Sequence, residues 1–295
     1  MTGNTLGWVI VAFVLYLLMM IAIGAFYAKG NNNSEDYFLG GRKLNGFVAA
    51  LSAQASDMSG WLLMGLPGAI YLTGVGGDGW IAIGLFIGTT LNWLFIATKL
   101  RRYTIRANNS VTLPTYFENR FHDEKKVLMA VSSITIVVFF LVYCASALSA
   151  GGQLFESVFG IDYHVALTIG ALVVLVYTFL GGFTAVCVTD FIQGMLMLVG
   201  ILAVPLFAYH FLTTGGTTLS AGLEASGADS ANFLNLMKNG DGSNNIISVI
   251  SGLGWGLGYF GMPHILVRFM AVRDEKEMTK SKATAILSLI PISAP

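Results

Sequence analysis

Asp57 is the residue of this sequence whose surroundings most strongly suggest chemistry. It lies in the stretch SAQASDMSGWLLM (52–64), inside an apolar run from Phe47 to Tyr71 that contains no lysine or arginine. A carboxylate inside a lipid bilayer is energetically costly, and such groups usually face a cavity or an ion pathway. We therefore interpret Asp57 as a functional candidate, although a purely structural role is the alternative.

Small and polar residues surround this carboxylate. Ser52, Ser56 and Ser59 recur at helical spacing, and a stripe of this kind can serve helix packing alone. Gly60, together with the two nearer serines, weakens a helix at this point. A broken helix frees backbone carbonyls, which suit a hard cation such as Na⁺. We expect an interrupted membrane helix here that contributes to an ion site.

A second weak point is SGLGWGLGYFGMPH (251–264), which is rich in glycine and contains a proline. An unbroken helix is improbable in the second half of this stretch. Trp255 and Tyr259 are four residues apart and share a helix face. The pair could wall a small organic ligand, whereas the alternative is simple packing or an aromatic belt at the membrane interface.

Other polar residues in apolar segments carry weaker signals. A semi-polar stripe begins with Tyr143 and Ser146 and is compatible with helix packing. Asp190 could cap a helix start beside Thr189 or take part in ion release, and both readings stay open. For His264 a structural hydrogen bond is favoured over proton transfer.

The elements that position these residues follow from the composition. Apolar residues make up 55% of the 295 residues and charged residues 11%, against roughly 25% charged in a soluble domain. The mean hydropathy is +0.71. This composition indicates an all-α polytopic membrane protein. Metalloprotease, paired-cysteine, nucleotide-loop and Ser/His/Asp patterns are absent from the sequence, so we do not expect an enzyme.

Seven apolar segments each reach or approach the roughly 20 residues that a membrane-spanning helix needs. We expect LGGF (180–183) to form a hairpin between spans 5 and 6, and an eighth segment to begin near Ala283. The expected spans 1 to 7 are 7–28, 46–71, 79–99, 127–157, 164–182, 184–212 and 246–270.

The positions of the basic residues predict the orientation. With the amino terminus outside, alternation of the seven spans places every one of the sixteen Lys and Arg residues except Lys238 on the cytoplasmic side. This strong positive-inside bias supports the span count. Because topology explains the basic loop 99–126, a nucleic-acid partner is not expected. The loop 213–245 is expected outside, with a short helix in its centre.

Several stretches resemble the sodium:solute symporter family, and in particular its sodium/proline symporters. The resemblance covers nearly the whole chain in order and spacing. It is carried by YFLGGRKL (37–44), ALSAQASDMSGWLLMGLPGAIY (50–71), LPTYF (113–117), VYCAS (142–146), LFESVFGIDYH (154–164), YTFLGGFTAVCVTDFIQG (177–194) and WGLGYFGMPHILVRFM (255–270).

The resemblance implies a five-plus-five inverted-repeat transporter fold. Residues 1–30 would be an extra N-terminal transmembrane helix, 44–212 the first inverted repeat with spans 2–6, and 246–295 the start of the second repeat. The two interrupted spans, 2 and 7, would then be equivalent first helices of the two repeats. Only the first repeat and the start of the second would be present.

The resemblance also implies the residues of the site. Sodium would be held by the backbone carbonyls of Ala55 and Met58, with Asp57 and Ser59 contributing to cation and substrate binding; no other metal and no resident cofactor is implied. Arg42 and Asp190 match positions linked to the inner gate and ion release. The substrate pocket would comprise Ser59, Gly60, Tyr143, Trp255, Tyr259 and Pro263.

Two departures from the family pattern qualify these expectations. Met262 stands where proline transporters more often carry glutamine, which allows an altered affinity or a close analogue of proline. Family members also continue well past the equivalent of Pro295, including a serine/threonine pair that completes the sodium site. We expect a fragment of a longer protein or a truncated product, which alone would not perform alternating access.

The function expected of the intact protein is sodium-coupled import of L-proline across the plasma membrane. Its partners would be sodium ion, L-proline or a close analogue, and the lipid bilayer. Two alternatives remain: a transporter-like sensor module of a signalling receptor, or an inactive truncated product. The sequence that follows residue 295 in the gene would distinguish them.

Overall fold

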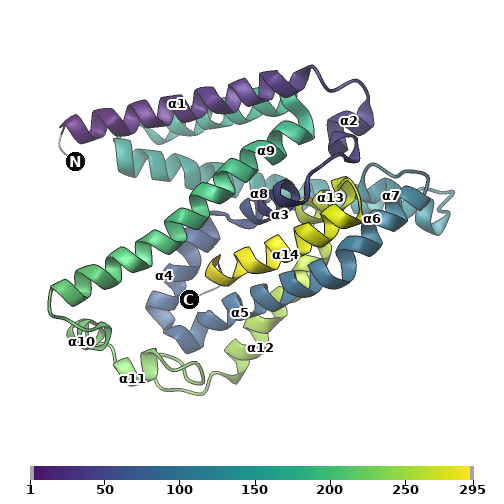
Figure 1. Cartoon of the computed structure of the whole chain (residues 1–295). Coiled ribbons are helices and arrows are strands. Elements are labelled where there is room, and N and C mark those ends of the chain that lie inside the picture. Colours follow the sequence, from purple (N-terminus) through teal and green to yellow (C-terminus); the bar gives the residue numbers. More distant parts are fainter. Residues whose placement is uncertain (1–2, 293–295) are drawn as a thin grey trace.

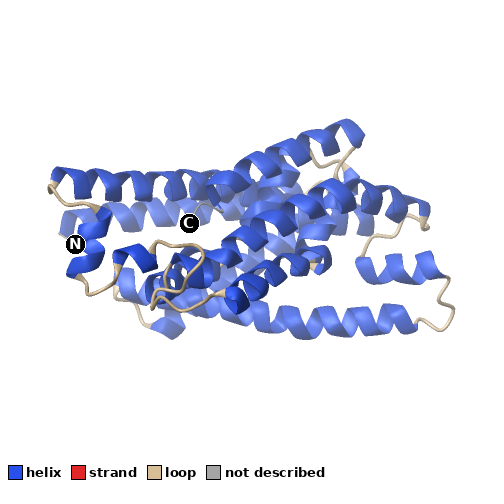
Figure 2. Cartoon of the chain, turned by 90° about the horizontal axis from the view of Figure 1, so that it is seen from below, coloured by secondary structure: helices blue, strands red, loops and turns tan. Residues whose placement is uncertain are grey.

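The computed structural model describes residues 3–292, and within this range it is helical, with two isolated β-bridges and no longer strand. Figure 1 shows the arrangement along the chain, and Figure 2 shows from below that the longest helices run roughly side by side. The elements are α1 (Gly3–Ala28), α2 (Ser34–Leu39), η1 (Gly40–Arg42), α3 (Gly46–Asp57), η2 (Trp61–Gly65), α4 (Leu66–Thr73), α5 (Val75–Leu91), η3 (Asn92–Ile96), α6 (Ala97–Arg106), α7 (Leu113–Phe121), α8 (Val127–Phe159), α9 (Tyr163–Thr214), α10 (Leu219–Ala225), α11 (Ser230–Phe233), α12 (Ile246–Trp255), η4 (Gly256–Gly261), α13 (Pro263–Ala271) and α14 (Glu275–Ile292).

Helices long and apolar enough to cross a membrane account for most of the predicted spans. By length and composition, four described helices qualify, and a fifth span is formed if one bent pair is counted. The four are Gly7–Ala28, Val75–Arg106, Val127–Phe159 and Tyr163–Thr214. The last contains predicted spans 5 and 6, and the bent pair is span 7. Span 2 does not qualify because its two halves, α3 and α4, are only 12 and 8 residues long.

Span 2 is interrupted, as the sequence predicts. α3 ends at Asp57, and Met58 leaves the helical conformation with φ −70° and ψ 88°. The chain resumes at Trp61 with one turn of π-helix, η2, before α4. π-helical turns are frequent at functional sites because they redirect side chains that a regular helix would place elsewhere.

Spans 5 and 6 are joined at Gly182 inside the 52-residue helix α9. Gly182 has φ 60° and ψ −159°, a conformation that is essentially restricted to glycine. In Figure 1 the chain turns sharply there, and the second half of α9 runs back past α3. A straight helix of this length would be about 78 Å long, more than twice the hydrocarbon thickness of a bilayer. The hairpin expected at LGGF is therefore a tight turn without a separate loop.

Span 7 is also interrupted. α12 continues into the 3₁₀ segment η4, and α13 begins at Pro263 after a bend of 45°. Proline lacks a backbone N–H and is well suited to the first position of a helix. α14 then begins at Glu275, before the apolar segment expected from Ala283. The end of that segment, residues 293–295, lies outside the described residues.

Short helices occupy the two long loops. The basic loop contains α7, whose first turn is closed by a capping box between Thr112 and Thr115. The loop 213–245 contains α10 and α11, one helix more than expected. This second loop is tied to the start of span 3, because Trp80 Nε1 donates to the Leu236 carbonyl at 2.8 Å and Asn245 Nδ2 to the Gly76 carbonyl at 2.8 Å.

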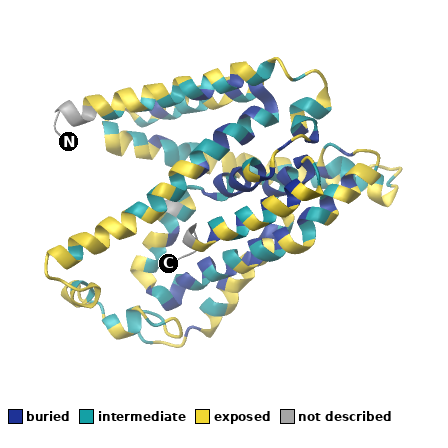
Figure 3. Ribbon diagram, in the orientation of Figure 1, coloured by how far each residue is buried: buried dark blue, intermediate teal, exposed yellow. Residues whose placement is uncertain are grey.

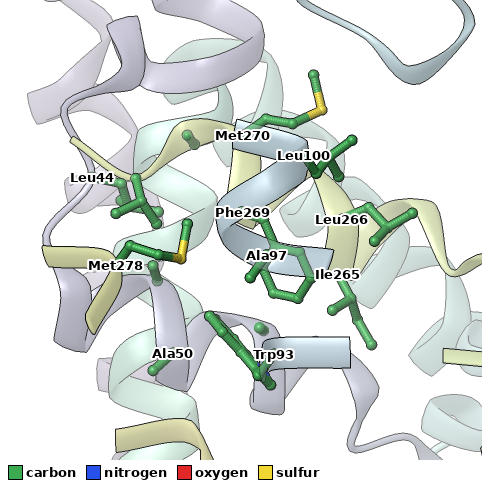
Figure 4. Packing of buried hydrophobic residues seen from close by; sticks show 14 of the residues in the cluster. Leu44, Ala50, Trp93, Ala97, Leu100, Ile265, Leu266, Phe269, Met270 and Met278 are labelled. Carbon is green, nitrogen blue, oxygen red and sulfur yellow. The ribbon is translucent and has the colours of Figure 1, made fainter. Parts of the chain in front are cut away.

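The buried residues concentrate where α3, α6, α13 and α14 meet, as Figure 3 shows in dark blue. The centre of this cluster is drawn in Figure 4, where Trp93 lies beneath Phe269. Their ring centroids are 4.4 Å apart in an edge-to-face arrangement, which is favourable for aromatic pairs. In contrast, α8 exposes apolar side chains along its length, as a helix that faces lipid does.

Glycines allow α5 and α12 to approach very closely. A Cβ atom added to Gly84 would lie 2.1 Å from the Gly252 carbonyl oxygen, and one added to Gly88 would lie 2.2 Å from the Gly256 carbonyl oxygen. Small residues at such spacing let membrane helices pack backbone against backbone. α5 therefore serves as the support against which the interrupted span 7 is held.

Replacing Gly84 with alanine should separate α5 from α12. Overpacking of this kind costs about 1–3 kcal/mol, so we expect a lower melting temperature of the purified protein in detergent. Gly170→Ala is the matched control, since an added Cβ there meets nothing within 4 Å. Equal melting temperatures for the two variants would contradict the close packing of α5 on span 7.

Candidate functional site

The two interrupted spans meet at a cavity of about 600 Å³. This volume lies within the range of small-molecule sites, roughly 300–1,000 Å³. α8 closes one side with Tyr143 and Ser146, the first two members of the semi-polar stripe. The described lining residues are Asp57, Ser59, Gly60, Trp61, Leu62, Met64, Gly65, Leu85, Tyr143, Ser146, Ala147, Ala150, Trp255, Tyr259, Met262 and His264.

The break in span 2 leaves backbone carbonyls outside the helical hydrogen-bond pattern. The last backbone bond of α3 runs from the Met58 N–H to the Gln54 carbonyl at 3.0 Å. Among the described residues, the Ser59 N–H does not continue this pattern to the Ala55 carbonyl. Tyr143 Oη donates instead to the Ser56 carbonyl at 3.2 Å. The segment that holds Ala55 and Met58 is thus the one whose oxygens are available to a ligand.

Asp57 is joined to span 7 by a short hydrogen bond. Tyr259 Oη donates to Asp57 Oδ2 at 2.5 Å. Tyr259 is almost completely buried, with 3% of its surface exposed, so its ring is fixed by its surroundings. A hydrogen bond to a carboxylate is stronger than one between neutral groups. The two interruptions are therefore connected directly at the cavity.

Aromatic side chains from four elements form a wall of the cavity. Trp61, at the start of η2, stacks on Trp255 at the end of α12, with ring centroids 5.7 Å apart and planes inclined by 11°. Tyr143 stacks on His264 at 5.8 Å and 20°. Flat apolar faces of this kind suit a small organic solute with an apolar ring or an amine cation.

His264 does not make the structural hydrogen bond that we expected. Neither of its ring nitrogens has a hydrogen-bond partner among the described residues. Its ring is held by aromatic contacts with Tyr143 and with Phe140, whose centroid is 5.4 Å away.

Asp190 lies outside the cavity lining, in a buried ion pair that connects spans 6, 2 and 7. Arg268 Nη2 lies 2.7 Å from Asp190 Oδ2, and Ser52 Oγ donates to the same oxygen at 2.8 Å. Arg268 Nε also donates to Ser52 Oγ at 2.8 Å, and Arg268 donates to the His264 carbonyl. Asp190 does not cap a helix start, because α9 passes through this position after its turn at Gly182.

Arg42 also lies away from the cavity, in η1. It is buried, and its guanidinium donates at 2.8 Å to each of the carbonyls of Met270 and Ser110. Next to it, the Leu44 N–H bonds the Ala271 carbonyl at 3.1 Å, and the Arg273 N–H bonds the Leu44 carbonyl at 3.0 Å. The segment before span 2 is thus fastened to the end of span 7.

The structure brings together most of the predicted substrate residues: Ser59, Gly60, Tyr143, Trp255 and Tyr259 line one cavity. Pro263 is not among its lining residues and lines a neighbouring groove instead. Sequence reasoning missed Trp61 and the role of Arg268. Trp61 follows the predicted break immediately, which is a usable signal. In the sequence, Arg268 stands out only as one of the basic residues expected on the cytoplasmic side.

Replacing Arg268 with leucine should destabilise the protein severely. The change would leave the Asp190 carboxylate buried without its partner, and breaking a buried pair costs about 3–5 kcal/mol. We expect a large fall in melting temperature, partly restored in Arg268→Leu/Asp190→Leu. The control is Arg102→Leu, because Arg102 pairs with Glu275 at 2.7 Å at the surface, where solvent screens the charges. Similar falls in melting temperature for Arg268→Leu and Arg102→Leu would contradict the buried ion pair of Arg268 with Asp190.

Comparison with known proteins gives close relatives. The sequence profile of the sodium:solute symporter family matches residues 37–294. A sodium/proline symporter of Salmonella typhimurium is 45% identical over 281 residues, which are 95% of this chain and 54% of that protein. The high-affinity proline transporter PutP of Bacillus subtilis is 47% identical over 263 residues, which are 89% of this chain and 54% of that protein.

A solved structure supports the fold independently. The structure of a Na⁺-coupled sialic acid symporter in a substrate-bound, outward-open state superposes with a TM-score of 0.74 at 19% identity, covering 94% of this chain and 58% of that one. The predicted fold class, an all-α membrane protein with part of a five-plus-five inverted repeat, is confirmed. The chain spans about half the length of the curated relatives it matches. It is a multi-pass membrane protein that belongs to the sodium:solute symporter family.

Proposed function

We propose that this chain forms part of a sodium-coupled secondary transporter that imports L-proline. The observation that carries the proposal is the meeting of two interrupted spans at one cavity, where Tyr259 donates to Asp57 at 2.5 Å and both residues line the cavity. Interrupted helices at the middle of a membrane protein are the common way to bind an ion and a solute together. The relatives named as proline transporters support the choice of solute.

Sodium would bind at the break in span 2, at the backbone carbonyls of Ala55 and Met58, with Asp57 and Ser59 beside them. α3 ends at Asp57, and the carboxyl end of a helix carries a partial negative charge that favours cations. Carbonyl and carboxylate oxygens suit the hard Na⁺ ion, and no other metal is proposed. Sodium is in this reading a transported ion, not a resident cofactor.

L-proline, or a close analogue, would occupy the cavity at Ser59, Gly60, Tyr143, Trp255 and Tyr259, with Pro263 behind its inner wall. Its carboxylate suits the amino-terminal ends of η2 and α13, which begin at the cavity and carry partial positive charge. Its apolar ring and cationic amine suit the Trp61–Trp255 and Tyr143 faces. No group in this scheme performs covalent chemistry, so the protein is proposed to be a carrier and not an enzyme.

Arg42 and Asp190 would belong to the inner gate. Arg42 fastens η1 to the Met270 carbonyl of α13, and the Asp190–Arg268 pair fastens α13 to span 6. Both contacts would have to open if α13 moves to release ligands inward. A change of this kind between two packed arrangements is how helices in such folds alternate.

The proposal includes an arrangement in the membrane. We propose the plasma membrane as the location, with the amino terminus outside. The proposed partners are the lipid bilayer and the two ligands, without nucleic acid. Residues 1–30 would form the extra helix, 44–212 the first repeat and 246–295 the start of the second. The glycine turn in α9 and the two interruptions support this division.

The experiment that tests the function is equilibrium proline binding with and without sodium. Because both proposed sites include Ser59, sodium should order the break and tighten proline binding by about 5–150-fold, the usual range of coupling between sites. Scintillation proximity binding on the protein produced from its own gene would measure this, with choline chloride at equal ionic strength as the control. An identical proline affinity in both salts would contradict the proposal.

A further inference from the structure

The interruption of span 7 removes the α-helical backbone partner of the Tyr259 carbonyl. In a continuous helix, the Tyr259 carbonyl would accept from the N–H of residue 263, but that residue is Pro263 and has no N–H. Met262 then leaves the helical conformation, with φ −73° and ψ 106°. Unsatisfied backbone groups are costly within a membrane protein.

A side chain from span 3 fills this gap. Asn92 Nδ2 donates to the Tyr259 carbonyl at 2.8 Å, and Asn92 is completely buried. A side chain also caps a carbonyl at the interruption of span 2, where Tyr143 Oη donates to the Ser56 carbonyl. Each break is thus capped by a polar side chain from an unbroken neighbouring span.

Asn92 is held rigidly in this position. It opens the π-helical turn η3, and the next residue, Trp93, is buried against Phe269 at 4.4 Å. It also continues the stripe of Gly84 and Gly88 at intervals of four, so it lies on the α5 face that packs against span 7. The glycines bring the two backbones together, and the first large polar side chain of the stripe reaches the Tyr259 carbonyl.

The amide of Asn92 is used only as a donor. Its Oδ1 atom has no hydrogen-bond partner among the described residues. A buried acceptor without a partner costs stability, so packing alone would favour leucine, which has a similar shape. We therefore infer that the amide N–H of Asn92 is needed for its hydrogen bond to the Tyr259 carbonyl and not only for packing.

We propose that Asn92 is a positioning residue for the ion and solute site. Its amide fixes the backbone at Tyr259, and the ring of that residue then presents Oη to Asp57 Oδ2 at 2.5 Å. Asn92 does not line the cavity, so it acts on Asp57 only through Tyr259. The proposal rests on the proposed function in one respect, namely that sodium binds beside Asp57.

A double-mutant cycle tests this positioning. The variants are Asn92→Leu, which removes the donor, Tyr259→Phe, which removes the hydroxyl, and the two together. The protein produced from its own gene is purified in detergent, and its melting temperature is measured at increasing sodium chloride, with choline chloride holding the ionic strength constant. The matched control is Thr90→Val, which removes a neighbouring buried hydroxyl that has no partner among the described residues.

We expect Asn92→Leu to raise the sodium concentration that gives half of the stabilisation by about tenfold, equivalent to about 1.4 kcal/mol. The double variant should be no worse than Tyr259→Phe alone, and Thr90→Val should match the wild type. If Asn92→Leu lowers the melting temperature but leaves the half-saturating sodium concentration unchanged, Asn92 is only structural and the proposal is wrong. The proposal would also be wrong if the fold-increase in half-saturating sodium concentration for the double variant equals the product of the fold-increases for the two single variants.

A failure of the proposed function would look different. In that case sodium would not stabilise the wild type beyond choline. The cycle is then read from melting temperatures without added sodium. Losses for Asn92→Leu and Tyr259→Phe that fall short of additivity would support the positioning role, whereas fully additive losses would contradict it.

Discussion

One hydrogen bond, from Tyr259 Oη to Asp57 Oδ2, joins two interrupted membrane helices, and the surrounding structure fixes both of its ends. The carboxylate sits at the carboxyl end of α3, where the helix stops and its carbonyls lose their partners. The phenol comes from a 3₁₀ segment that precedes a proline. A bilayer offers no water to replace lost backbone bonds, so each break has to be satisfied by neighbouring side chains or by ligands.

The unbroken helices supply that support in different ways. Span 3 contributes the glycines of α5 for close approach and Asn92 of η3 as a cap, while α8 contributes Tyr143 to the cavity wall and to the Ser56 carbonyl. The ion pair of Asp190 with Arg268 ties span 6 to α13 beneath the cavity. At the break of span 2, Ala55 and Met58 are the residues whose carbonyls the proposed function requires as oxygen ligands for sodium.

Local chemistry made the breaks predictable from sequence. Serines and glycine around Asp57, and glycines before Pro263, indicate weak helices without any knowledge of neighbours. The turn at Gly182 was also visible as LGGF. Pairings between distant segments could not be predicted from the sequence. Arg268 contacts Asp190 across 78 positions of the chain, and Asn92 contacts Tyr259 across 167. The expected cytoplasmic location of Arg268 explains its charge without a buried partner, so the sequence gives no reason to look for one. Asn92 belongs to no recognisable motif, so nothing in the sequence indicates its role.

Cavity membership was predicted better than hydrogen bonding. Residues beside the two breaks lie close to the space between the interrupted spans, and Ser59, Gly60, Trp255 and Tyr259 line one cavity there. Pro263 flanks the same break but begins α13, so its ring turns toward the neighbouring groove. His264 was expected to have a hydrogen bond, yet aromatic packing holds it instead. The direction of a side chain beyond a kink depends on tertiary packing that residue types alone do not determine.

The most direct test of the account is the coupling between sodium and proline in Tyr259→Phe. Isothermal titration calorimetry would give the proline affinity with and without sodium for this variant and for the wild type. If the phenol–carboxylate bond joins the two breaks energetically, the ratio of the two affinities should fall toward one in the variant, while proline still binds. A ratio equal to that of the wild type would contradict the central claim.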